Sequence, residues 1–450
     1  MKDHDYLNEH NAQHMWHPMG HPGEARTNNP TVITKANGVH ITDMQGHSVV
    51  DAVGGLWCVN LGYSNNVVKQ AISDQLFELP YYSAFFGTSN PTAIEASHAV
   101  TDFFAEDGMV RAFFTSGGSD SVETALRLAR QYHRLRGEPT RTKFLSLKKG
   151  YHGTHFGGAS VNGNNRFRTA YEPMLPGCFH LPSPYTYRNP FNETDPAKLA
   201  QLIAQAFEDE IEFQGASTIA AFIMEPVQGA GGVIVPDATF MPLMREICTR
   251  HGILMISDEV ITGFGRLGSW SGARHWGVKP DMMTCAKGIT SGYFPVGATM
   301  IGDKVADVFE SDQSGEGAIF HGYTYSAHPV GSAAVVACLS ETLKADTKTN
   351  AAARGTQLFQ GVQKLAQKYD VIGDVRGGEG LMTGLELVSD KAAKTPMDMA
   401  TMKRVHKTAY EAGCMVRLAG HSIVMSPPLT ISEAETQVIL DALDVGLAAV

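Results

Sequence analysis

The stretch ILMISDEV (253–260) decides how the chain folds. Its apolar run, Ile253–Ser257, has the length of a strand and ends at the carboxylate of Asp258. The residues before it, Met241–His251, have the spacing of an amphipathic helix, and Gly252 suits the C′ position that closes such a helix. A helix that leads into a buried strand is the unit from which parallel sheets are built.

The same pattern, an apolar run that ends at a charged residue, occurs both before and after this stretch. IAAFIMEP (219–226) runs into Glu225, and MMTCAKG (282–288) runs into Lys287. A strand–helix–strand unit is nearly always right-handed, so its strands are parallel and their carboxyl ends meet at one edge of the sheet. Ligands of open α/β sheets bind at that edge. We therefore expect Glu225, Asp258 and Lys287 to lie together in a site.

The remaining pattern predicts an α/β fold in two domains. Residues 65–328 alternate short apolar strands with amphipathic helices, which is typical of a large doubly wound domain with a mostly parallel sheet. Residues 329–450 are expected to form a smaller α+β domain, to which residues 1–64 add a polar arm and further structure. The pattern predicts a hairpin at Gly38–Asp51, a helix at Val330–Leu343, and strands at Gly380–Leu387 and Ser422–Met425.

A loop in the large domain suits a phosphate group. Arg111–Thr115 has the pattern of a strand, and the loop Ser116–Ser119 leads from it into a helix that ends near Arg136. We expect Ser119 to cap this helix. A Gly/Ser loop at a helix N-terminus presents backbone N–H groups and the positive end of the helix dipole to an anion.

A phosphate loop, a lysine and a carboxylate together are what pyridoxal phosphate (PLP) requires. The lysine forms a Schiff base with the cofactor, and an acidic partner keeps the pyridine nitrogen protonated. Lys287 and Asp258 suit these two roles, because opposite charges a few ångströms apart favour the ionised forms of both groups. Once displaced by a substrate amine, Lys287 becomes a free base that can move a proton.

Composition excludes several other classes of protein. A formal net charge of −10 and the lack of a Lys/Arg-rich run argue against a nucleic-acid partner. We expect no secretory signal and no membrane span, because the first residues lack an apolar core and no apolar run reaches about 18 residues. Scattered cysteines without a C-x-x-C pair indicate reduced core residues and a cytoplasmic protein; they are Cys58, Cys178, Cys248, Cys285, Cys338 and Cys414.

Taken together, the motifs resemble class III (omega-type) aminotransferases of PLP fold type I, over essentially the whole chain. They are DAVGGLWCVNLGY (51–63), FFTSGGSDSVETALRLAR (113–130), GYHG (150–153), AAFIMEPVQGAGGV (220–233), ISDEVITGFGRLG (256–268), CAKGITSGYFPVGA (285–298) and HGYTYSAHP (321–329). One departure is at residues 117–121, where relatives often have Ser-Gly-Ser-Glu-Ala and this chain has Gly-Gly-Ser-Asp-Ser. The Gly-Ser pair that would contact phosphate is kept, and one hydroxyl is missing.

The resemblance implies a role for each residue of the cofactor site. Lys287 would be the Schiff-base lysine and Asp258 the partner of the pyridine nitrogen. The family binds its cofactor with groups from two chains, which implies a homodimer, or possibly a tetramer. The other implied residues are Gly118 and Ser119 at the phosphate, Thr324 at the phosphate of the neighbouring subunit, Tyr151 and Val260 on the two ring faces, and Glu225 beside the ring hydroxyl.

The resemblance also implies which residues bind the substrate. Trp57 corresponds to an apolar wall of the amine pocket, and Phe85 and Phe86 to aromatic residues lent across the dimer interface; Tyr151 also belongs to this pocket. Arg417 corresponds to a mobile arginine that binds the carboxylate of a keto acid, for which its planar guanidinium is suited. Core packing is an equal alternative for Trp57 and the two phenylalanines. Trp16 is a further candidate at the entrance.

Other readings of individual motifs are weaker. The segment Gly229–Gly232 resembles a dinucleotide-binding loop, but it opens an apolar strand-like run where that fingerprint requires a helix. His152 and His155 could hold a metal, yet no carboxylate is placed beside them, so no metal site is predicted. The N-terminal histidines are expected to be solvated; they are His4, His10, His14, His17 and His21.

Alternatives within the PLP fold remain open from the sequence. They are a non-catalytic binding protein and an enzyme that racemises, isomerises or decarboxylates its substrate. Arg417 and Trp57 favour full transamination, with pyruvate as the expected acceptor. A diamine or an omega-amino acid is the expected donor, ahead of taurine.

Overall fold

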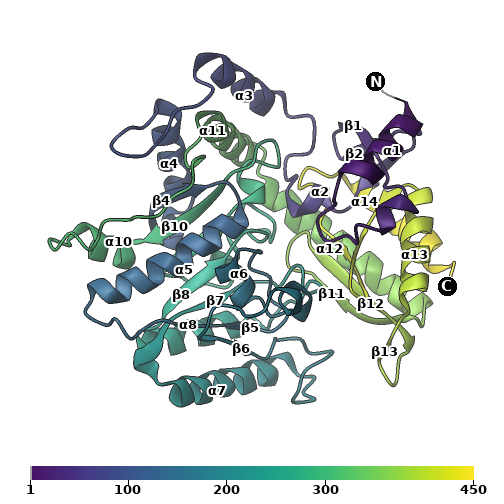
Figure 1. Ribbon diagram of the computed structural model, residues 1–450. Coiled ribbons are helices and arrows are strands. Elements are labelled where there is room, and N and C mark those ends of the chain that lie inside the picture. Colours follow the sequence, from purple (N-terminus) through teal and green to yellow (C-terminus); the bar gives the residue numbers. More distant parts are fainter. Residues whose placement is uncertain (1–2) are drawn as a thin grey trace.

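A seven-stranded sheet forms the centre of the molecule, with strand order β4-β10-β9-β8-β7-β5-β6. The computed structural model, shown in Figure 1, describes residues 3–450. Only β10 in this sheet is antiparallel to its neighbours, β4 and β9. The strands are β4 (Met109–Thr115), β5 (Lys143–Leu147), β6 (Cys178–Leu181), β7 (Ile219–Met224), β8 (Leu254–Asp258), β9 (Met282–Cys285) and β10 (Gly297–Gly302).

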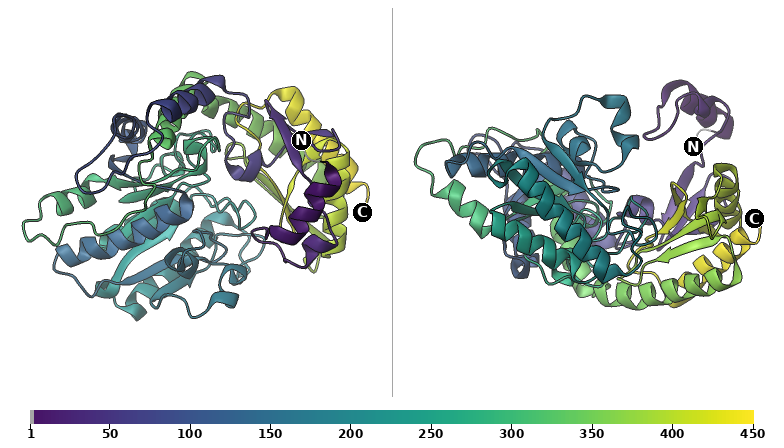
Figure 2. Two further views of the ribbon diagram at one scale, coloured as in Figure 1. Left: turned by 45° about the horizontal axis from the view of Figure 1, so that its top comes forward. Right: turned by 90° about the horizontal axis from the view of Figure 1, so that it is seen from below.

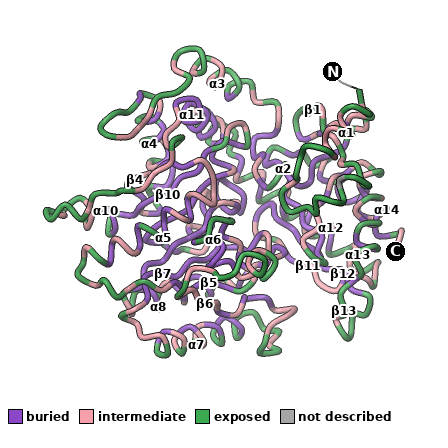
Figure 3. The backbone as a smooth tube through the Cα atoms, viewed as in Figure 1, coloured by how far each residue is buried: buried purple, intermediate pink, exposed green. Residues whose placement is uncertain are grey.

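Helices cover both faces of this sheet because its inner strands are apolar on both. Side chains alternate between the two faces of a strand. In β7, Ile223 packs with α5 (Gly118–Leu135) and α10 (Asp303–Glu310) on one face. Phe222 and Met224 pack with α7 (Pro196–Gln214) and α8 (Phe240–His251) on the other. The burial map shows the result as a continuous buried layer through the sheet (Figure 3).

A further group of helices packs beyond the β4–β10 edge. It consists of α3 (Asn66–Glu78), α4 (Pro91–Phe103) and α11 (Pro329–Lys344), and α11 contacts each of the other two in the upper part of Figure 1. The predicted domain boundaries, after residues 64 and 328, stay predictions. The helix α11, which directly follows the second of these, packs against α3 and α4.

The N-terminal and C-terminal parts of the chain share a second core. Their ribbons lie side by side in Figures 1 and 2. The parallel pairing of Cys414 with Val50 joins β14 (Cys414–Met415) to β3 (Ser48–Asp51). The other elements of this part are β1 (Ile33–Asn37), β2 (His40–Asp43), β11 (Ile372–Arg376), β12 (Thr383–Asp390), β13 (Thr395–Pro396), β15 (Arg417–Ala419), β16 (Ser422–Met425), α12 (Thr347–Lys368), α13 (Met399–Glu411) and α14 (Glu433–Leu447).

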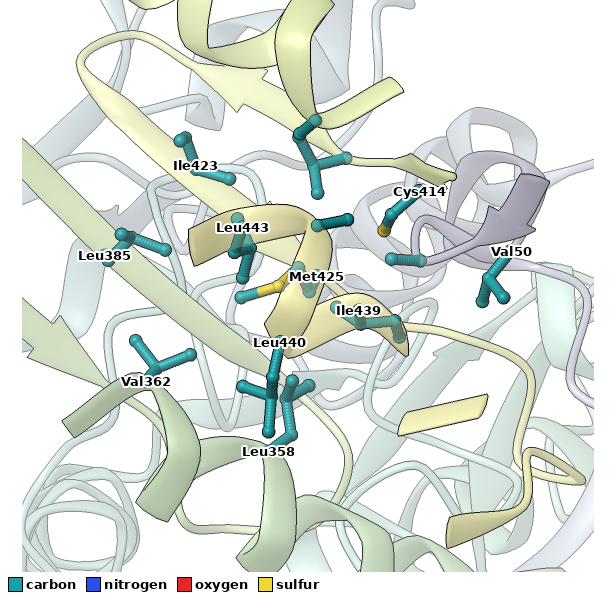
Figure 4. Close-up of a cluster of buried hydrophobic side chains, with 14 of the residues drawn as sticks. Val50, Leu358, Val362, Leu385, Cys414, Ile423, Met425, Ile439, Leu440 and Leu443 are labelled. Atoms are coloured by element: carbon teal, nitrogen blue, oxygen red, sulfur yellow. The ribbon is translucent and has the colours of Figure 1, made fainter. Parts of the chain in front are cut away.

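Apolar side chains from these elements converge between the sheet of this part and its helices. Figure 4 shows Leu385 and Ile423 from the sheet, Leu358 from α12 and Leu443 from α14 directed toward one another. Val50 joins the same cluster from the N-terminal side. Burial of these side chains stabilises the part that carries Arg417 on its β15 strand.

The structure confirms the predicted strands and helices around the sheet edge. β7 and β16 have the predicted bounds, and α8 ends at Gly252, whose φ of 68° is the left-handed conformation that glycine favours. The capping role of Ser119 is wrong. The N-cap is Gly117, two residues before Ser119, and the helix α5 begins at Gly118, so Ser119 lies inside the first turn.

The N-terminal arm contains a helix that the polar sequence did not predict. It is α1 (His4–His14), capped by the side chain of Asp3, and none of its residues is buried. Capping and solvated side chains account for it better than packing does. The remaining short elements are α2 (Gly54–Trp57), α6 (Phe156–Val161), α9 (Gly272–His275), and the 3₁₀ turns at 24–26, 105–107, 165–167, 169–171, 216–218 and 287–289. Within residues 3–450, no helix is long and apolar enough to cross a bilayer.

Gly355, in the interior of α12, provides a test of this packing. Replacing a helical glycine by alanine usually stabilises a protein, by roughly 0.5–1 kcal/mol. Here a Cβ atom would lie 1.9 Å from the carbonyl oxygen of Gly380, so the backbone must move. We expect Gly355→Ala to destabilise the protein by about 1–3 kcal/mol, seen as a lower midpoint of thermal denaturation. The exposed neighbour Thr356→Ala is the control and should leave the midpoint within a degree or so; an unchanged midpoint in Gly355→Ala would contradict the packing.

Candidate active site

A cavity of about 160 Å³ lies at the carboxyl edge of the central sheet. Strands β7, β8 and β9 deliver the three predicted charged residues to it, as the parallel register requires. The structure therefore brings together most of the predicted cofactor residues. Those that line the cavity are Gly118, Ser119, Tyr151, Glu225, Asp258, Val260 and Lys287.

Asp258 lies at the floor of this cavity and is only 3% exposed. Its Oδ1 accepts hydrogen bonds from the hydroxyl of Thr284 at 3.0 Å and from the backbone N–H of Val260 at 3.2 Å. Its Oδ2 lies 2.7 Å from Nδ1 of His152. These three contacts fix the orientation of the Asp258 carboxylate in the cavity.

His152 is a member of the site that the sequence argument did not assign. Its ring is buried, with 1% of the residue exposed. Because Nδ1 faces an acceptor, the proton of the neutral ring belongs on Nδ1. Its Nε2 is buried and makes no hydrogen bond to any residue in the described part of the chain. Asn162 holds the backbone N–H of His152, so the ring is fixed in place beside Asp258.

Lys287 follows β9 in a 3₁₀ turn and has a φ of 49°. Within residues 3–450 its amine makes no hydrogen bond or ion pair. Burial lowers the pKa of Lys287 below its usual value, and the nearby carboxylates of Asp258 and Glu225 oppose this shift. A lowered pKa raises the fraction of neutral amine, which is the nucleophilic form.

Glu225 occupies the next place along the edge, at the end of β7. Burial raises its pKa to about 7, and the charge of Asp258 adds to the effect. Both carboxylate oxygens accept backbone N–H groups, Oε1 from Tyr151 at 2.9 Å and Oε2 from Gly229 at 3.0 Å. Glu225 is thus poised between its two protonation states near neutral pH.

The N-terminus of α5 forms the opposite side of the cavity. Gly118 faces Val260, and a Cβ atom on Gly118 would lie 3.1 Å from both methyl groups of that valine. Gly153 also approaches closely, since its Cβ would lie 2.5 Å from Oγ of Ser119. The two glycines leave room beside a helix end that favours anions.

Tyr151 and Arg417 form the part of the site nearest the small sheet. Burial lowers the pKa of Arg417, and the neighbouring Tyr151 opposes this shift. Arg417 also acts on Lys287, whose pKa it lowers. The arginine is half-buried on β15 and lies beside a second, larger cavity of about 700 Å³.

The structure does not bring every predicted substrate residue to the cavity. Trp57 is 3% exposed and packs in a buried cluster with Val227 and Ile261. The backbone turns at Gly54 and Gly55, which both have positive φ, and Leu56 rather than Trp57 lines the cavity. The predicted role of Trp57 as a wall of the amine pocket stays a prediction.

Thr324, Phe85 and Phe86 also lie away from the cavity. Thr324 is exposed, and its carbonyl accepts a hydrogen bond from the hydroxyl of Tyr81 at 2.8 Å. Phe85 and Phe86 line a separate surface hollow of about 770 Å³, and Phe86 is 99% exposed. Their predicted roles involve a second subunit and stay predictions. Trp16, at 81% exposed, is likewise on the surface.

The residues at the sheet edge fit PLP on several independent counts. The amine of the half-buried Lys287, which makes no hydrogen bond or ion pair within residues 3–450, shares the cavity with the buried carboxylate of Asp258. Gly118 and Gly153 provide space at the N-terminus of a helix of 18 residues, which suits the phosphate. Val260 and Tyr151 supply an apolar and an aromatic surface for the ring.

Comparison with known proteins agrees with this geometry. The aminotransferase class-III family matches residues 23–447. The chain belongs to the class-III aminotransferases. It is a PLP-dependent transaminase of fold type I, and its large parallel sheet is the one found in that fold.

Individual class-III proteins are similar over most of their length. The putrescine–pyruvate aminotransferase of Pseudomonas aeruginosa is 37% identical over 415 residues, which cover 90% of this chain and 87% of the relative. The omega-aminotransferase of Caulobacter vibrioides is 36% identical over 93% of both chains. A PLP-bound amine transaminase from an uncultivated Pseudomonas species superposes with a TM-score of 0.95 at 47% identity, covering 97% of this chain and 98% of that one.

Two of the residues that the sequence argument missed carried a usable signal. His152 follows β5, so the rule about carboxyl ends of strands applies to it, as it does to the predicted neighbour Tyr151. Thr284 pairs with Asp258 in the β8–β9 register, which places the two side chains on neighbouring strands. His155 lies elsewhere, with Nε2 2.5 Å from Asp120, so the two histidines of this segment serve different carboxylates.

His152→Phe tests the contact with Asp258. The ring volume is kept, but the buried carboxylate loses a charge-assisted hydrogen bond, so we expect the Kd for PLP to rise about 10- to 100-fold. The Kd is measured by titrating the apoprotein with PLP and following absorbance. His133→Phe is the matched control, because His133 is an equally buried histidine, bonded to Glu138, outside the cavity. Equal losses in both variants would contradict a specific role for His152.

Proposed function

We propose that this transaminase moves the amino group of a diamine or an omega-amino acid to pyruvate in a two-stage, ping-pong reaction. One observation carries the assignment of its site: the half-buried Lys287, which makes no hydrogen bond or ion pair to the described residues, shares a cavity with the Asp258–His152 pair. The similarity to a putrescine–pyruvate aminotransferase and to an omega-aminotransferase supports the choice of donor and acceptor.

Lys287 is the proposed catalytic base. When bound, PLP supplies an electron sink for the negative charge that develops on the substrate carbon. Lys287 Nζ would hold the cofactor and, when free, would take the proton from the substrate carbon. The burial that lowers its pKa favours the neutral amine needed for both tasks.

Asp258 and Glu225 are proposed to hold the ring from two sides. Asp258, oriented by His152 and Thr284, would bind the ring nitrogen. Glu225 would stand beside the ring hydroxyl, where its protonation state near pH 7 sets whether it donates or accepts a hydrogen bond. Gly118 and Ser119 would bind the phosphate through the N-terminus of α5.

Substrate selection is proposed to depend on Arg417 and Leu56. The guanidinium of Arg417 can bind the carboxylate of pyruvate or of an omega-amino acid in two parallel hydrogen bonds. A diamine has no carboxylate and would need the arginine to turn away from the cavity. Leu56 supplies the apolar contact that the sequence assigned to Trp57.

A homodimer is proposed as the working form. The segments that carry Phe85, Phe86 and Thr324 expose large apolar side chains, since Phe86 is 99% and Phe320 96% exposed. Exposed aromatic patches of this kind mark protein–protein interfaces. A second copy would cover them and bring Thr324 to the phosphate of its neighbour. We also propose a cytoplasmic location, in keeping with six free cysteines.

A donor screen with pyruvate tests the proposed reaction. Purified holoenzyme is given pyruvate with putrescine, β-alanine or taurine, and amino transfer is followed as alanine formed. We expect alanine from putrescine or β-alanine, and no turnover by Lys287→Ala. Racemisation or decarboxylation without transfer to any keto acid would contradict transamination.

Within the same screen, Arg417→Leu should distinguish donors that carry a carboxylate from donors that do not. We expect the half-reaction with β-alanine and the return reaction with pyruvate to lose about 10- to 100-fold in kcat/KM, because each loses a charged hydrogen-bond partner. The half-reaction with putrescine should change little. Arg404→Leu, on α13 and hydrogen-bonded to the carbonyl of Ala449, is the control. Equal losses with all donors would contradict a carboxylate-binding role.

A further inference from the structure

The glycine-rich segment Gly229–Gly232, which does not bind a dinucleotide, forms a closed loop beside the active site. Gln228 and Ile234 pair at its base through two backbone hydrogen bonds, both of 3.0 Å. The carbonyl of Gly229 accepts from the N–H groups of Gly232 at 3.0 Å and Val233 at 3.1 Å. These bonds make residues 229–233 a compact loop, called the 229–233 loop below. A displacement of Gly232 would therefore also displace Gly229.

The loop contains a backbone conformation that needs support from its surroundings. Val233 has a φ of 57°, which is unfavourable for a β-branched residue, and it is fully buried. Gly232 before it has a φ of 115°. Conformations of this kind persist only where neighbouring groups hold them.

Arg376, at the end of β11, is the group that holds this loop. Its Nε donates to the carbonyl oxygen of Gly232 at 2.7 Å. The rest of its guanidinium is fixed by Tyr185, Asp374 and Ser422 at 2.7, 2.6 and 2.7 Å. The residue is only 8% exposed, and a planar fork with this many partners has one available orientation.

The other end of the loop contacts the active site. The N–H of Gly229 donates to Oε2 of Glu225 at 3.0 Å, and this is one of the two backbone donors that the carboxylate has. A side chain at Gly229 would lie 2.6 Å from Cδ1 of Ile261, which lines the cavity. The loop therefore joins a guanidinium of the small sheet to a carboxylate of the large one. In Figure 1, β11 lies at the inner side of the small sheet, facing the large one.

We propose that Arg376 is a positioning residue of the active site, which orients Glu225 by fixing the 229–233 loop through the Gly232 carbonyl. The inference rests on the proposed role of Glu225 in the cofactor site. Through Arg376, the strand β11 would affect the orientation of Glu225, although β11 itself supplies no side chain to the cavity.

The predicted consequence is a change in the proton affinity of Glu225. Release of the loop weakens the hydrogen bond from Gly229, which favours the charged carboxylate, so the pKa of Glu225 rises above its value of about 7. The other charged and titratable groups that face it are Tyr151 and His152 after β5, Asp258 after β8 and Lys287 after β9. None of these four contacts Arg376 by a hydrogen bond.

Infrared titration of the holoenzyme tests this consequence without turnover. The stretch of the protonated Glu225 carboxyl is identified as the band that is lost in Glu225→Gln. We expect Arg376→Met to move the midpoint of this band upward by about one pH unit, the equivalent of part of one charged hydrogen bond. The same substitution should shift the pH dependence of kcat/KM, and it should no longer do so in the Glu225→Gln background.

Arg188→Met is the matched control. Arg188 binds Glu386 at 2.7 Å, and Glu386 also pairs with Arg376, so this variant disturbs the same polar network. Arg188 makes no contact with the 229–233 loop. We expect both variants to lower the midpoint of thermal denaturation, and only Arg376→Met to move the carboxyl band. Where Arg376→Met does not fold, Arg376→Lys removes the planar fork while keeping the charge, and the same shift is expected.

Three results would overturn the proposal. One is a carboxyl midpoint that does not move in Arg376→Met or Arg376→Lys. Another is an equal movement in Arg188→Met, which would indicate a general effect of domain packing. The third is a shift in the kcat/KM profile of Arg376→Met that persists in the Glu225→Gln background. A Glu225→Gln variant with an unchanged profile would instead contradict the role of Glu225, which is a separate failure.

Discussion

The parallel register of β7, β8 and β9 is the constraint on which the active site depends. Ser257 pairs with Met224 and Asp258 with Thr284, so the three strands end level with one another. Glu225, Asp258 and Lys287 are therefore delivered to one edge by backbone hydrogen bonds alone. A shift of one residue in β8 would turn Asp258 to the other face of the sheet.

Placing several charged groups at a poorly solvated sheet edge costs desolvation free energy. The surrounding polar groups offset this cost. An isolated buried charge either finds partners or changes its protonation state. Asp258 has His152, Thr284 and a backbone N–H, whereas Lys287 has no direct partner in the described chain and its pKa falls. Glu225 has two backbone donors and a raised pKa. The opposite pKa shifts of Glu225 and Lys287 bring both groups closer to neutral pH, where acid–base catalysis is most effective.

Local pattern was sufficient to predict the elements that carry these groups. Apolar runs with charged ends predicted β7 and β8 to within a residue, and the Gly/Ser loop predicted where α5 begins. The same pattern could not show which of two adjacent residues faces the cavity. Positive φ angles at Gly54 and Gly55 decide that Leu56, and not Trp57, faces the cavity, and no periodicity reveals them. The contacts of His152 and Arg376 depend on segments more than 100 residues apart, or on a second sheet, and lie outside any local signal.

The central claim is that Lys287, as the third charged strand end, carries the cofactor. Borohydride reduction of the holoenzyme, followed by proteolysis and mass spectrometry of the peptides, tests it most directly. The account predicts that the mass of the reduced cofactor is found on the peptide that contains Lys287 and on no other lysine. Attachment elsewhere, for example at the half-buried Lys149 in the Lys-Gly pair after β5, would contradict it.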